Sequence, residues 1–552
     1  MKSLMMDDFP LTLSPLLVRA ERLFPRVTVA SRRPDRAVQY TDYGSIMIRA
    51  RTLTAALLEE GIRRGDRVAT LMWNHSSHLE AYFGVPAAGA VLHTINLRLP
   101  PDHLAYVINH ARDRWILVDD VLLPTLEKVR DRIHVERVIV VPFSGQPVPT
   151  GSEDYEQLLG RHRPTDALPE IGEKEAAGLC YTSGTTGLPK GVVYSHRSIV
   201  LHTLATAFSL GLGQGDSFLV VVPMFHVNAW GFPFTMAMLG ARQVLPGPHL
   251  DAESVLDLLE REKVTMAAGV PAVWFGVLEA LEKEPSRWKL DPRLRMVVGG
   301  AAMPESMVRR FAKLGIGPIH GYGLTETSPI MTLGIPKESM KSWDLERRIA
   351  VLSRQGIPLP YVELRVQDWD GVVLPWDGQS VGELQVRGPW IARDYFENPE
   401  SADKWTDDGW FRTGDVANID PEGYVQIVDR IKDLVKSGGE WISSVAIENS
   451  LVGHPAVREA AVVARPDPKW GERPLAFVVP KEGTHVTAEE LRDLLAGQYP
   501  KWWLPDEIRL VPSLPKTSTG KLSKRTLREM LASESKASTD TSVEAPIRTN
   551  VQ

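Results

Sequence analysis

The sequence predicts an α/β fold with more than one domain, and three observations support this prediction. The chain has 552 residues, which is long for a single hydrophobic core. Strand-like and helical segments alternate up to about residue 355, as in folds built on largely parallel sheets. Beyond that point the strand-like segments alternate polar and apolar residues and are separated by turns, which is typical of antiparallel sheet.

The expected elements follow from the spacing of apolar residues. Helical spacing predicts helices at 43–60, 80–90, 252–263 and 488–495. Strands of the parallel type are predicted at 67–72, 115–118, 137–141, 217–222 and 295–298. Alternation by twos predicts antiparallel strands at 362–366, 382–386 and 424–428. Two further strands, 460–464 and 475–479, belong to a smaller α/β unit near the end of the chain.

Domain boundaries are predicted from these changes in pattern. Residues 1–428 form the expected N-terminal domain, and the charged stretch that follows contains a boundary at 429–432. Residues 433–532 form the expected C-terminal domain. Residues 533–552 are small and polar, so we predict a disordered tail there.

Composition limits the classes of function. The formal net charge is -6 and the pI is near 6.2, which gives no electrostatic signal for nucleic acid. The one cysteine, Cys180, excludes an intrachain disulfide and indicates a reducing compartment; its apolar surroundings favour a buried strand residue over a nucleophile. Asp7 and Asp8 stand where an export signal needs an apolar core. We therefore expect a soluble, cytoplasmic protein, with membrane-surface contact left open.

The segment YTSGTTGLPKGV, from Tyr181 to Val192, has the composition of a phosphate-binding loop. Its glycines let backbone N–H groups point into one concavity, its hydroxyls add donors, and Lys190 supplies a cation. The segment lacks the Walker A spacing, because Leu188 and Pro189 separate the last glycine of the loop from the lysine. A flexible surface turn would not explain so many glycine and hydroxyl positions before a lysine. The segment predicts a phosphate site that is not that of a P-loop NTPase or a kinase.

Three other segments carry candidate residues, each weak by itself. In HGYGLTET, which begins at His320, the aromatic Tyr322 could stack on a base and Glu326 could bind Mg²⁺. In WFRTGD, Asp415 could accept hydrogen bonds from two ribose hydroxyls, although a turn residue is an equal interpretation. In PKTSTGK, Lys521 is a second lysine next to a glycine, and composition alone favours a solvated loop.

Taken together, these segments resemble the adenylate-forming superfamily of acyl-CoA synthetases, luciferases and peptide-synthetase adenylation domains. The matching segments occur in the family order over roughly residues 10–530: YTSGTTGLPKG, PMFH, VVGGAAM, GYGLTET, WFRTGD, DRIKDLVKSGGEWIS and PKTSTGK. VPMFHVNAWG and KSGGEWISS are most similar to bacterial long- and medium-chain fatty-acyl-CoA synthetases. The resemblance implies two parallel-type α/β subdomains and a small antiparallel barrel-like subdomain in the N-terminal domain, followed by a small mobile α+β domain.

The resemblance also implies a two-step reaction with ATP, Mg²⁺ and CoA. The acid attacks the α-phosphorus of ATP, pyrophosphate leaves, and CoA then displaces AMP from the acyl-adenylate. The C-terminal domain would rotate about 429–432 between the steps, because Lys521 and CoA both need access to the same reacting group.

Residue roles are carried over from matching positions. The resemblance implies a catalytic role for Lys521, Glu326, Thr182 and Lys432, with Thr182 and Glu326 at the metal. The implied nucleotide site contains Thr182, Ser183, Gly184, Thr185, Thr186, Gly187, Lys190, Gly300, Ala301, His320, Gly321, Tyr322, Gly323, Thr325, Asp415, Arg430, Lys432 and Trp441. The implied acyl site contains His226, Trp230 and Gly231. The implied CoA path contains Lys436, Gly438, Gly439 and Glu440.

Several alternatives remain open from the sequence. Trp230 could be an indole that only fills the core rather than a gate to an acyl tunnel. The acid could be a medium- or long-chain fatty acid, or a short or modified acid such as an alkylthio-propionate or an aryl acid. The absence of an acid near Trp230 argues against an amino-acid substrate. A non-catalytic sensor on a decayed scaffold is disfavoured by the joint presence of Lys190, Glu326, Asp415 and Lys521, and a homodimer is expected from the resemblance.

Overall fold

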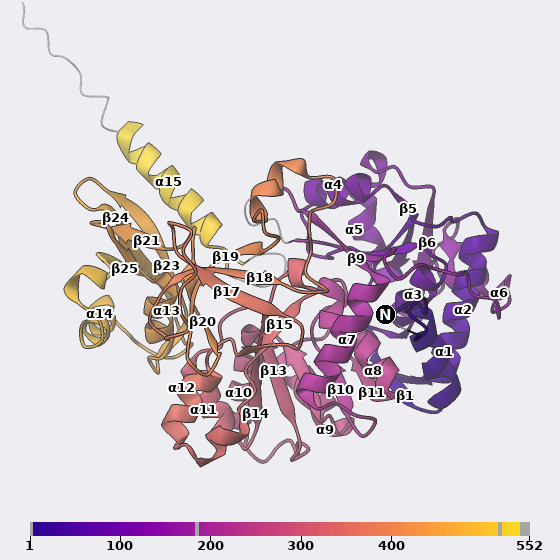
Figure 1. Cartoon of the computed structure of the whole chain (residues 1–552), viewed down its shortest axis with the longest axis horizontal. Helices are drawn as coiled ribbons and strands as arrows, with labels where there is room; N and C mark the ends of the chain where they lie inside the picture. The colour runs from indigo at the N-terminus through magenta and orange to yellow at the C-terminus, as the bar shows by residue number, and fades with distance from the viewer. Residues whose placement is uncertain (1–3, 183–186, 517–521, 541–552) are drawn as a thin grey trace, which may run out of the picture.

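Two large sheets form most of the N-terminal part of the molecule (Figure 1). The computed structural model describes residues 4–182, 187–516 and 522–540. The seven-stranded sheet has the order β7 (Glu153–Asp154), β6 (Arg137–Val141), β5 (Asp113–Asp119), β3 (Arg67–Leu71), β4 (Val91–Thr94), β8 (Ala176–Tyr181), β9 (Gly191–Ser195). Its neighbouring strands are parallel except for the β8–β9 pair.

The second large sheet has nine strands. Their order is β16 (Ile357–Pro358), β15 (Ile330–Leu333), β14 (Gly317–Gly323), β13 (Arg295–Gly299), β12 (Met266–Gly269), β10 (Ser217–Val220), β11 (Arg242–Leu245), β1 (Thr28–Arg32), β2 (Val38–Asp42). The run from β14 to β1 is parallel, and antiparallel strands stand at both ends. The prediction of largely parallel sheets is confirmed.

Helices cover both faces of each large sheet, which explains why the strands are apolar along their length. Along β10, Phe218 and Val220 belong to the core shared with the seven-stranded sheet, whereas Leu219 packs with α9 and α10 on the other face. The helices of this part are α1 (Ser14–Leu23), α2 (Tyr43–Glu59), α3 (Ser76–Ala87), α4 (Pro101–Ala111), α5 (Leu123–Glu127), α6 (Tyr155–Gly160), α7 (His196–Leu210), α8 (Phe232–Leu239), α9 (Ala252–Arg261), α10 (Pro271–Lys283), α11 (Glu305–Lys313) and α12 (Leu345–Leu352).

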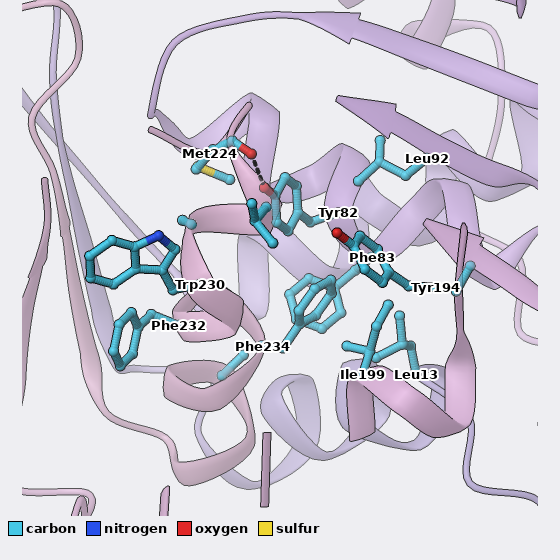
Figure 2. Close-up of a cluster of buried hydrophobic side chains, with 14 of the residues drawn as sticks. Leu13, Tyr82, Phe83, Leu92, Tyr194, Ile199, Met224, Trp230, Phe232 and Phe234 are labelled. Atoms are coloured by element: carbon cyan, nitrogen blue, oxygen red, sulfur yellow. Dashed lines mark hydrogen bonds between the residues drawn. The ribbon is translucent and has the colours of Figure 1, made fainter. Parts of the chain in front are cut away.

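The shared core between the two sheets is rich in aromatic side chains (Figure 2). Tyr82 and Phe83 of α3 meet Phe234 of α8, with ring centroids 5.3 and 5.5 Å apart. The Tyr82 hydroxyl donates a hydrogen bond to the carbonyl of Met224, at the start of the loop that carries Trp230. The core therefore holds this loop directly.

A four-stranded antiparallel sheet follows, as the alternation of residues predicts. Its order is β17 (Glu363–Gln367), β18 (Gly382–Arg387), β19 (Phe411–Ile419), β20 (Val425–Arg430). The apolar residues of β17 and β18, such as Val366 and Leu384, pack into the N-terminal core.

The C-terminal part has its own sheet and core (Figure 1). Its strands are ordered β22 (Glu440–Ile442), β21 (Val435–Ser437), β24 (Gly471–Pro480), β23 (Val457–Asp467), with β25 (Glu507–Leu510) parallel to β24. Its helices are α13 (Ser444–Val452), α14 (Ala488–Ala496) and α15 (Lys524–Asp540). β20 ends at Arg430 and β21 begins at Val435 in the other sheet, on either side of residues 431–434.

Helix α15 corrects one prediction. It continues to Asp540, so the first part of the segment predicted as a disordered tail is helical. The helix is anchored by the buried Leu527, and propagation of an existing helix costs far less than nucleation of a new one. Residues 541–552 lie outside the described part of the chain.

Within the described residues, no helix has both the length and the apolar character needed to cross a membrane.

Candidate functional site

The predicted nucleotide residues lie at strand ends of the two large sheets and on two neighbouring strands of the four-stranded sheet. Thr182 follows β8, Gly300 follows β13, and Gly323 ends β14. Asp415 lies on β19 and Arg430 ends β20. Open α/β sheets bind ligands outside the carboxyl ends of their strands, so the location itself is typical of a ligand site.

Lys190 is held beside Glu326 through Tyr395. The β8–β9 hairpin fixes the lysine backbone, because Thr182 N donates to Lys190 O at 2.9 Å and Lys190 N donates to Thr182 Oγ1 at 3.1 Å. Lys190 Nζ donates to Ser401 Oγ at 2.5 Å and lies 5.0 Å from the centroid of the Tyr395 ring. The Tyr395 hydroxyl donates to Glu326 Oε1. One cation and one carboxylate are thus aligned by a single buried tyrosine.

The Glu326 segment is also tied to its surroundings by backbone groups. The Tyr194 hydroxyl of β9 donates to Thr325 O at 2.7 Å, and Ala392 N donates to Glu326 O at 2.8 Å. These bonds bring the strand after the phosphate loop and the HGYGLTET segment together. Ser183, Gly184, Thr185 and Thr186 lie outside the described residues.

Asp415 forms a second cluster with Tyr322 and Arg430. The Tyr322 hydroxyl donates to Asp415 Oδ2, and Arg430 Nε lies 3.1 Å from Asp415 Oδ1. The Asp415 carboxylate raises the pKa of Arg430, and burial raises the pKa of Tyr322. Oδ2 of Asp415 accepts from Tyr322, and Oδ1 contacts Arg430. Each of the two oxygens therefore retains a second lone pair that can accept a hydrogen bond from a ligand hydroxyl.

Trp230 touches the strand end that leads to Gly300 and Ala301. A Cβ atom on Gly299 would lie 2.6 Å from Gly321 O and 2.9 Å from Trp230 Cη2, so only glycine fits there. The predicted adenine residues and the predicted acyl residue are therefore in contact through Gly299. His320 lies in the same strand as Gly321, and its Nδ1 is 2.9 Å from Ser353 O.

The segment that carries Trp230 has a left-handed backbone. Val227, Asn228, Ala229 and Trp230 have φ values of 46°, 51°, 48° and 58°, and Gly231 follows with 77°. Left-handed φ is costly for residues with a Cβ and persists only where surrounding contacts fix it. Here Thr235 Oγ1 donates to Gly231 O at 3.0 Å, and the His202 ring fills the space where a Gly231 side chain would lie.

The side chains of this segment are buried and apolar in character. Trp230 is 6% exposed, and Phe225, Val227, Phe232 and Phe234 are also buried. Figure 2 shows Trp230 and Phe232 beside the aromatic core rather than inside its centre. Burial of this kind suits both a core indole and an apolar substrate wall, so the role of Trp230 stays a prediction.

His202, Tyr395 and Ser401 are site residues that the sequence did not reveal. His202 is buried, and its Nε2 accepts a hydrogen bond from Ile330 N at 3.2 Å, while burial lowers its pKa to about 3. This imidazole is neutral beside Gly231. Tyr395 and Ser401 lie between the HGYGLTET and WFRTGD segments, and no residue pattern around them indicates a ligand site.

The predicted CoA residues form the β21–β22 turn. Gly438 and Gly439 have φ values of 63° and 91°, and Lys436 and Glu440 flank them. Lys436 Nζ lies 5.2 Å from the centroid of the Trp441 ring. The Trp441 ring also contacts Trp369 of the β17–β18 turn, with centroids 6.3 Å apart.

Of the two lysines predicted to be catalytic, Lys432 and Lys521, only Lys432 lies in the described part of the chain. Burial lowers the pKa of Lys432, and the neighbouring Arg430 lowers it further. Lys521 lies outside the described residues, and the residues that flank its loop, Lys516 and Leu522, form an antiparallel bridge.

Comparison with known proteins gives consistent results. A family model for "AMP-binding enzyme" matches residues 23–396, and one for "AMP-binding enzyme C-terminal domain" matches residues 446–521. The chain is 49% identical over 531 residues to the "Long-chain-fatty-acid--CoA ligase" of Thermus thermophilus, with 96% of both chains covered. It is 43% identical over 528 residues to the "3-methylmercaptopropionyl-CoA ligase" of Ruegeria lacuscaerulensis, with 94% of this chain and 97% of the relative covered.

Among solved structures, the chain resembles the anthranilate CoA ligase AuaEII in complex with anthranoyl-AMP. The TM-score is 0.86 at 27% sequence identity, and 96% of this chain and 99% of the other are covered.

Proposed function

The chain belongs to the AMP-binding enzyme family and is an AMP-forming acyl-CoA synthetase, and from this premise we propose that it activates medium- and long-chain fatty acids. ATP, the acid and CoA give acyl-CoA, AMP and pyrophosphate through an acyl-adenylate. The observation that carries the proposal is the contact between Trp230 and Gly299, which joins a buried apolar segment to the nucleotide residues. The fatty-acid ligase of Thermus thermophilus, 49% identical to this chain, supports the same class of acid.

The proposed nucleotide site combines a positively charged part at the phosphates with a carboxylate at the ribose. Lys190, Thr182 and residues 183–187 are assigned to the β- and γ-phosphates, and Asp415 accepts hydrogen bonds from the ribose hydroxyls. Gly300, Ala301, Gly321 and Tyr322 frame the adenine, and Lys521 neutralises charge at the α-phosphate during adenylation. The buried Asp415 and its fixed partners support this role, because a ligand would meet a carboxylate that is already oriented.

The residues present fit a magnesium ion that shares ligands with ATP. Thr182 and Glu326 offer oxygen atoms, which Mg²⁺ prefers, and the described residues contain no group of three or more metal-binding side chains that would hold an ion alone. The bound ion would neutralise phosphate charge. Tyr395 orients the Glu326 carboxylate toward that role by its hydrogen bond.

A rotation of the C-terminal domain about 429–432 would bring Lys521 and then CoA to the same reacting group. Lys521 is needed in the first step, and the Lys436–Glu440 turn is needed for CoA in the second. The glycines of that turn permit close approach of the CoA arm.

A short or modified acid is the second candidate. The 3-methylmercaptopropionyl-CoA ligase of Ruegeria lacuscaerulensis, 43% identical to this chain over nearly its whole length, favours it. The left-handed turn around Trp230 brings its indole ring close to Gly299, which would suit a shorter acyl group equally well.

A CoA-dependent AMP-release assay decides between the two candidates. Straight-chain acids of increasing length are compared with 3-methylmercaptopropionate and an aryl acid, and reactions without CoA serve as the control. We expect the highest kcat/KM among medium or long chains. A maximum at the short sulfur-containing or aryl acid would contradict the first candidate and favour the second.

We also propose a cytoplasmic homodimer. The family resemblance supports the dimer, and the single buried Cys180 suits a reducing compartment. Sedimentation velocity of the purified chain tests the oligomeric state.

A further inference from the structure

A polar cavity lies between the β1–β2 turn and α9, apart from the residues described above. It has a volume of about 430 Å³ and is lined by Arg32, Arg36, Asp257, Glu260 and Arg261. Arg32 ends β1, and the other four come from the turn and the helix. These elements belong to the large N-terminal part and lie away from the C-terminal sheet (Figure 1).

Arg32 is a buried guanidinium without a carboxylate partner. The residue is 6% exposed, and Nη1 donates to the carbonyl of Ser254 at 2.7 Å. Its Nε makes no hydrogen bond, and none of the described carboxylates lies within ion-pair distance of the guanidinium. Proteins usually pair buried charges directly, because a buried ion without a contacting counter-charge is costly. Burial lowers the pKa of Arg32, and Asp257 and Asp251 offset this only in part.

The two acidic residues of the cavity are engaged elsewhere. Asp257 Oδ1 accepts a hydrogen bond from Trp288 Nε1 at 3.0 Å. Glu260 Oε1 accepts one from Lys289 N at 2.8 Å. Neither carboxylate is therefore directed solely at the arginines, although Asp257 is close enough to raise the pKa of Arg32 in part.

The other two arginines add positive charge to the same space. Arg36 lies in the turn with φ 68°, and its Nη1 donates to Ser254 Oγ at 2.8 Å. Its Nη2 is 3.7 Å from Asp251, a long and half-exposed ion pair. Arg261 lies one helical turn after Asp257, and its Nε is 3.2 Å from the Tyr40 hydroxyl and 3.4 Å from Glu262 Oε1. Both guanidinium groups retain donors beyond these contacts.

We propose that this cavity binds a phosphate-class oxyanion, either inorganic phosphate or the phosphate ester of a small metabolite. Guanidinium forks match the oxygen geometry of phosphate, and the anion would supply the directly contacting counter-charge that Arg32 lacks. The volume exceeds that of phosphate alone and lies within the range of small-ligand sites. The site is separate from the phosphate loop at Lys190.

The proposal is tested by thermal unfolding of the full chain with inorganic phosphate, with sodium chloride at matched ionic strength as the control. We expect the unfolding temperature to rise with phosphate. Arg32→Met should weaken phosphate binding by roughly tenfold or more, since charged hydrogen bonds are lost. Arg36→Gln and Arg261→Gln, at exposed positions, should each weaken it several-fold. Arg293→Gln is the matched control, because Arg293 is exposed and paired with Asp291 outside the cavity.

The phosphate loop of the catalytic site contributes equally in all variants, so the difference from wild type reports this cavity. Without phosphate, Arg32→Met should unfold at the same temperature as wild type or higher, because it removes an unpaired buried charge. A lower temperature would show a structural role for Arg32 and overturn the proposal. Equal responses to phosphate in wild type, Arg36→Gln and Arg261→Gln would also overturn it, even if Arg32→Met failed to fold.

Glycerol phosphate serves as the second probe: binding at least tenfold tighter than inorganic phosphate identifies an ester ligand, and equal or weaker binding identifies the free ion.

Discussion

At the scale of single residues, Tyr395 links the cation Lys190 and the carboxylate Glu326 of the proposed adenylation site. Burial and the Glu326 carboxylate raise the pKa of Tyr395, so the hydroxyl stays protonated and donates a hydrogen bond to Glu326. Tyr395→Phe removes this bond and keeps the ring beside Lys190. We expect a loss of roughly tenfold in ATP–pyrophosphate exchange, the size of one hydrogen bond to a charged group. Tyr395→Leu should lose more, because the ring is also removed.

Tyr361→Phe is the matched control for this prediction, because Tyr361 is 82% exposed. Unchanged exchange in Tyr395→Phe would show that Glu326 is oriented by its other contacts.

The same residues show what the sequence could predict about the site. Lys190, Glu326 and Asp415 lie in short segments whose residue types indicate phosphate, metal and ribose binding. Tyr395 and Ser401 meet Glu326 and Lys190 across 69 and 211 positions of the chain. Contacts of this kind depend on how the four-stranded sheet packs against the N-terminal core, and local residue patterns carry no signal for them.

At the scale of elements, buried strands were predictable, but not every buried helix was. The strand predicted at 137–141 agrees with β6, because strands covered on both faces read as short continuous apolar runs. Helix α7 was not predicted, since it is buried on most sides and its residues show no polar stripe. The predicted helix at 80–90 begins at Ser76 in α3, since its first turn is polar and gave no apolar repeat.

The helices of the C-terminal part contain a titratable pair with a consequence for stability. Glu448 of α13 accepts from Lys524 Nζ of α15 and from Val462 N, both at 2.7 Å. Burial raises the pKa of Glu448 to about 7, above its ordinary value of 4.5, although Lys524 opposes the shift. A carboxyl group with a raised folded-state pKa stabilises the fold below its unfolded pKa, and this contribution is lost as the pH rises through the folded value.

We therefore predict that α13 loses stability between about pH 4.5 and pH 7, by at most about 1.4 kcal/mol per pH unit. Hydrogen exchange of the Ser444–Val452 amides, corrected for the intrinsic rate at each pH, measures it. Glu448→Gln should abolish this slope, and Glu482→Gln, an exposed glutamate of the same domain, should retain it. A slope that survives in Glu448→Gln would assign the titration to another group.

At the scale of the whole molecule, hydrogen bonds from Ser443 and Ser444 join the C-terminal part to the N-terminal part near the predicted hinge. Ser443 Oγ donates to Val428 O, and Ser444 N and Oγ both donate to Asp429 Oδ2, each at 2.6 Å. These bonds lie next to 429–432, so a rotation there could leave them nearly in place. The contact between Trp369 and Trp441 joins a turn of the four-stranded sheet to the CoA-path hairpin, and a rotation would separate it.

The Trp369–Trp441 pair should therefore favour one orientation of the C-terminal domain over the other. An aromatic pair contributes about 0.5–1.5 kcal/mol, which corresponds to a shift of roughly two- to tenfold in a two-state equilibrium. We predict that Trp369→Ala changes the ratio of the adenylation rate to the thioester-forming rate by this factor. Pyrophosphate exchange measures the first rate, and CoA-dependent consumption of supplied acyl-adenylate measures the second. Trp376→Ala, at a similarly exposed tryptophan of the same subdomain, should leave the ratio unchanged. If both rates fall equally in Trp369→Ala, the tryptophan supports the fold and does not bias the orientation of the domain.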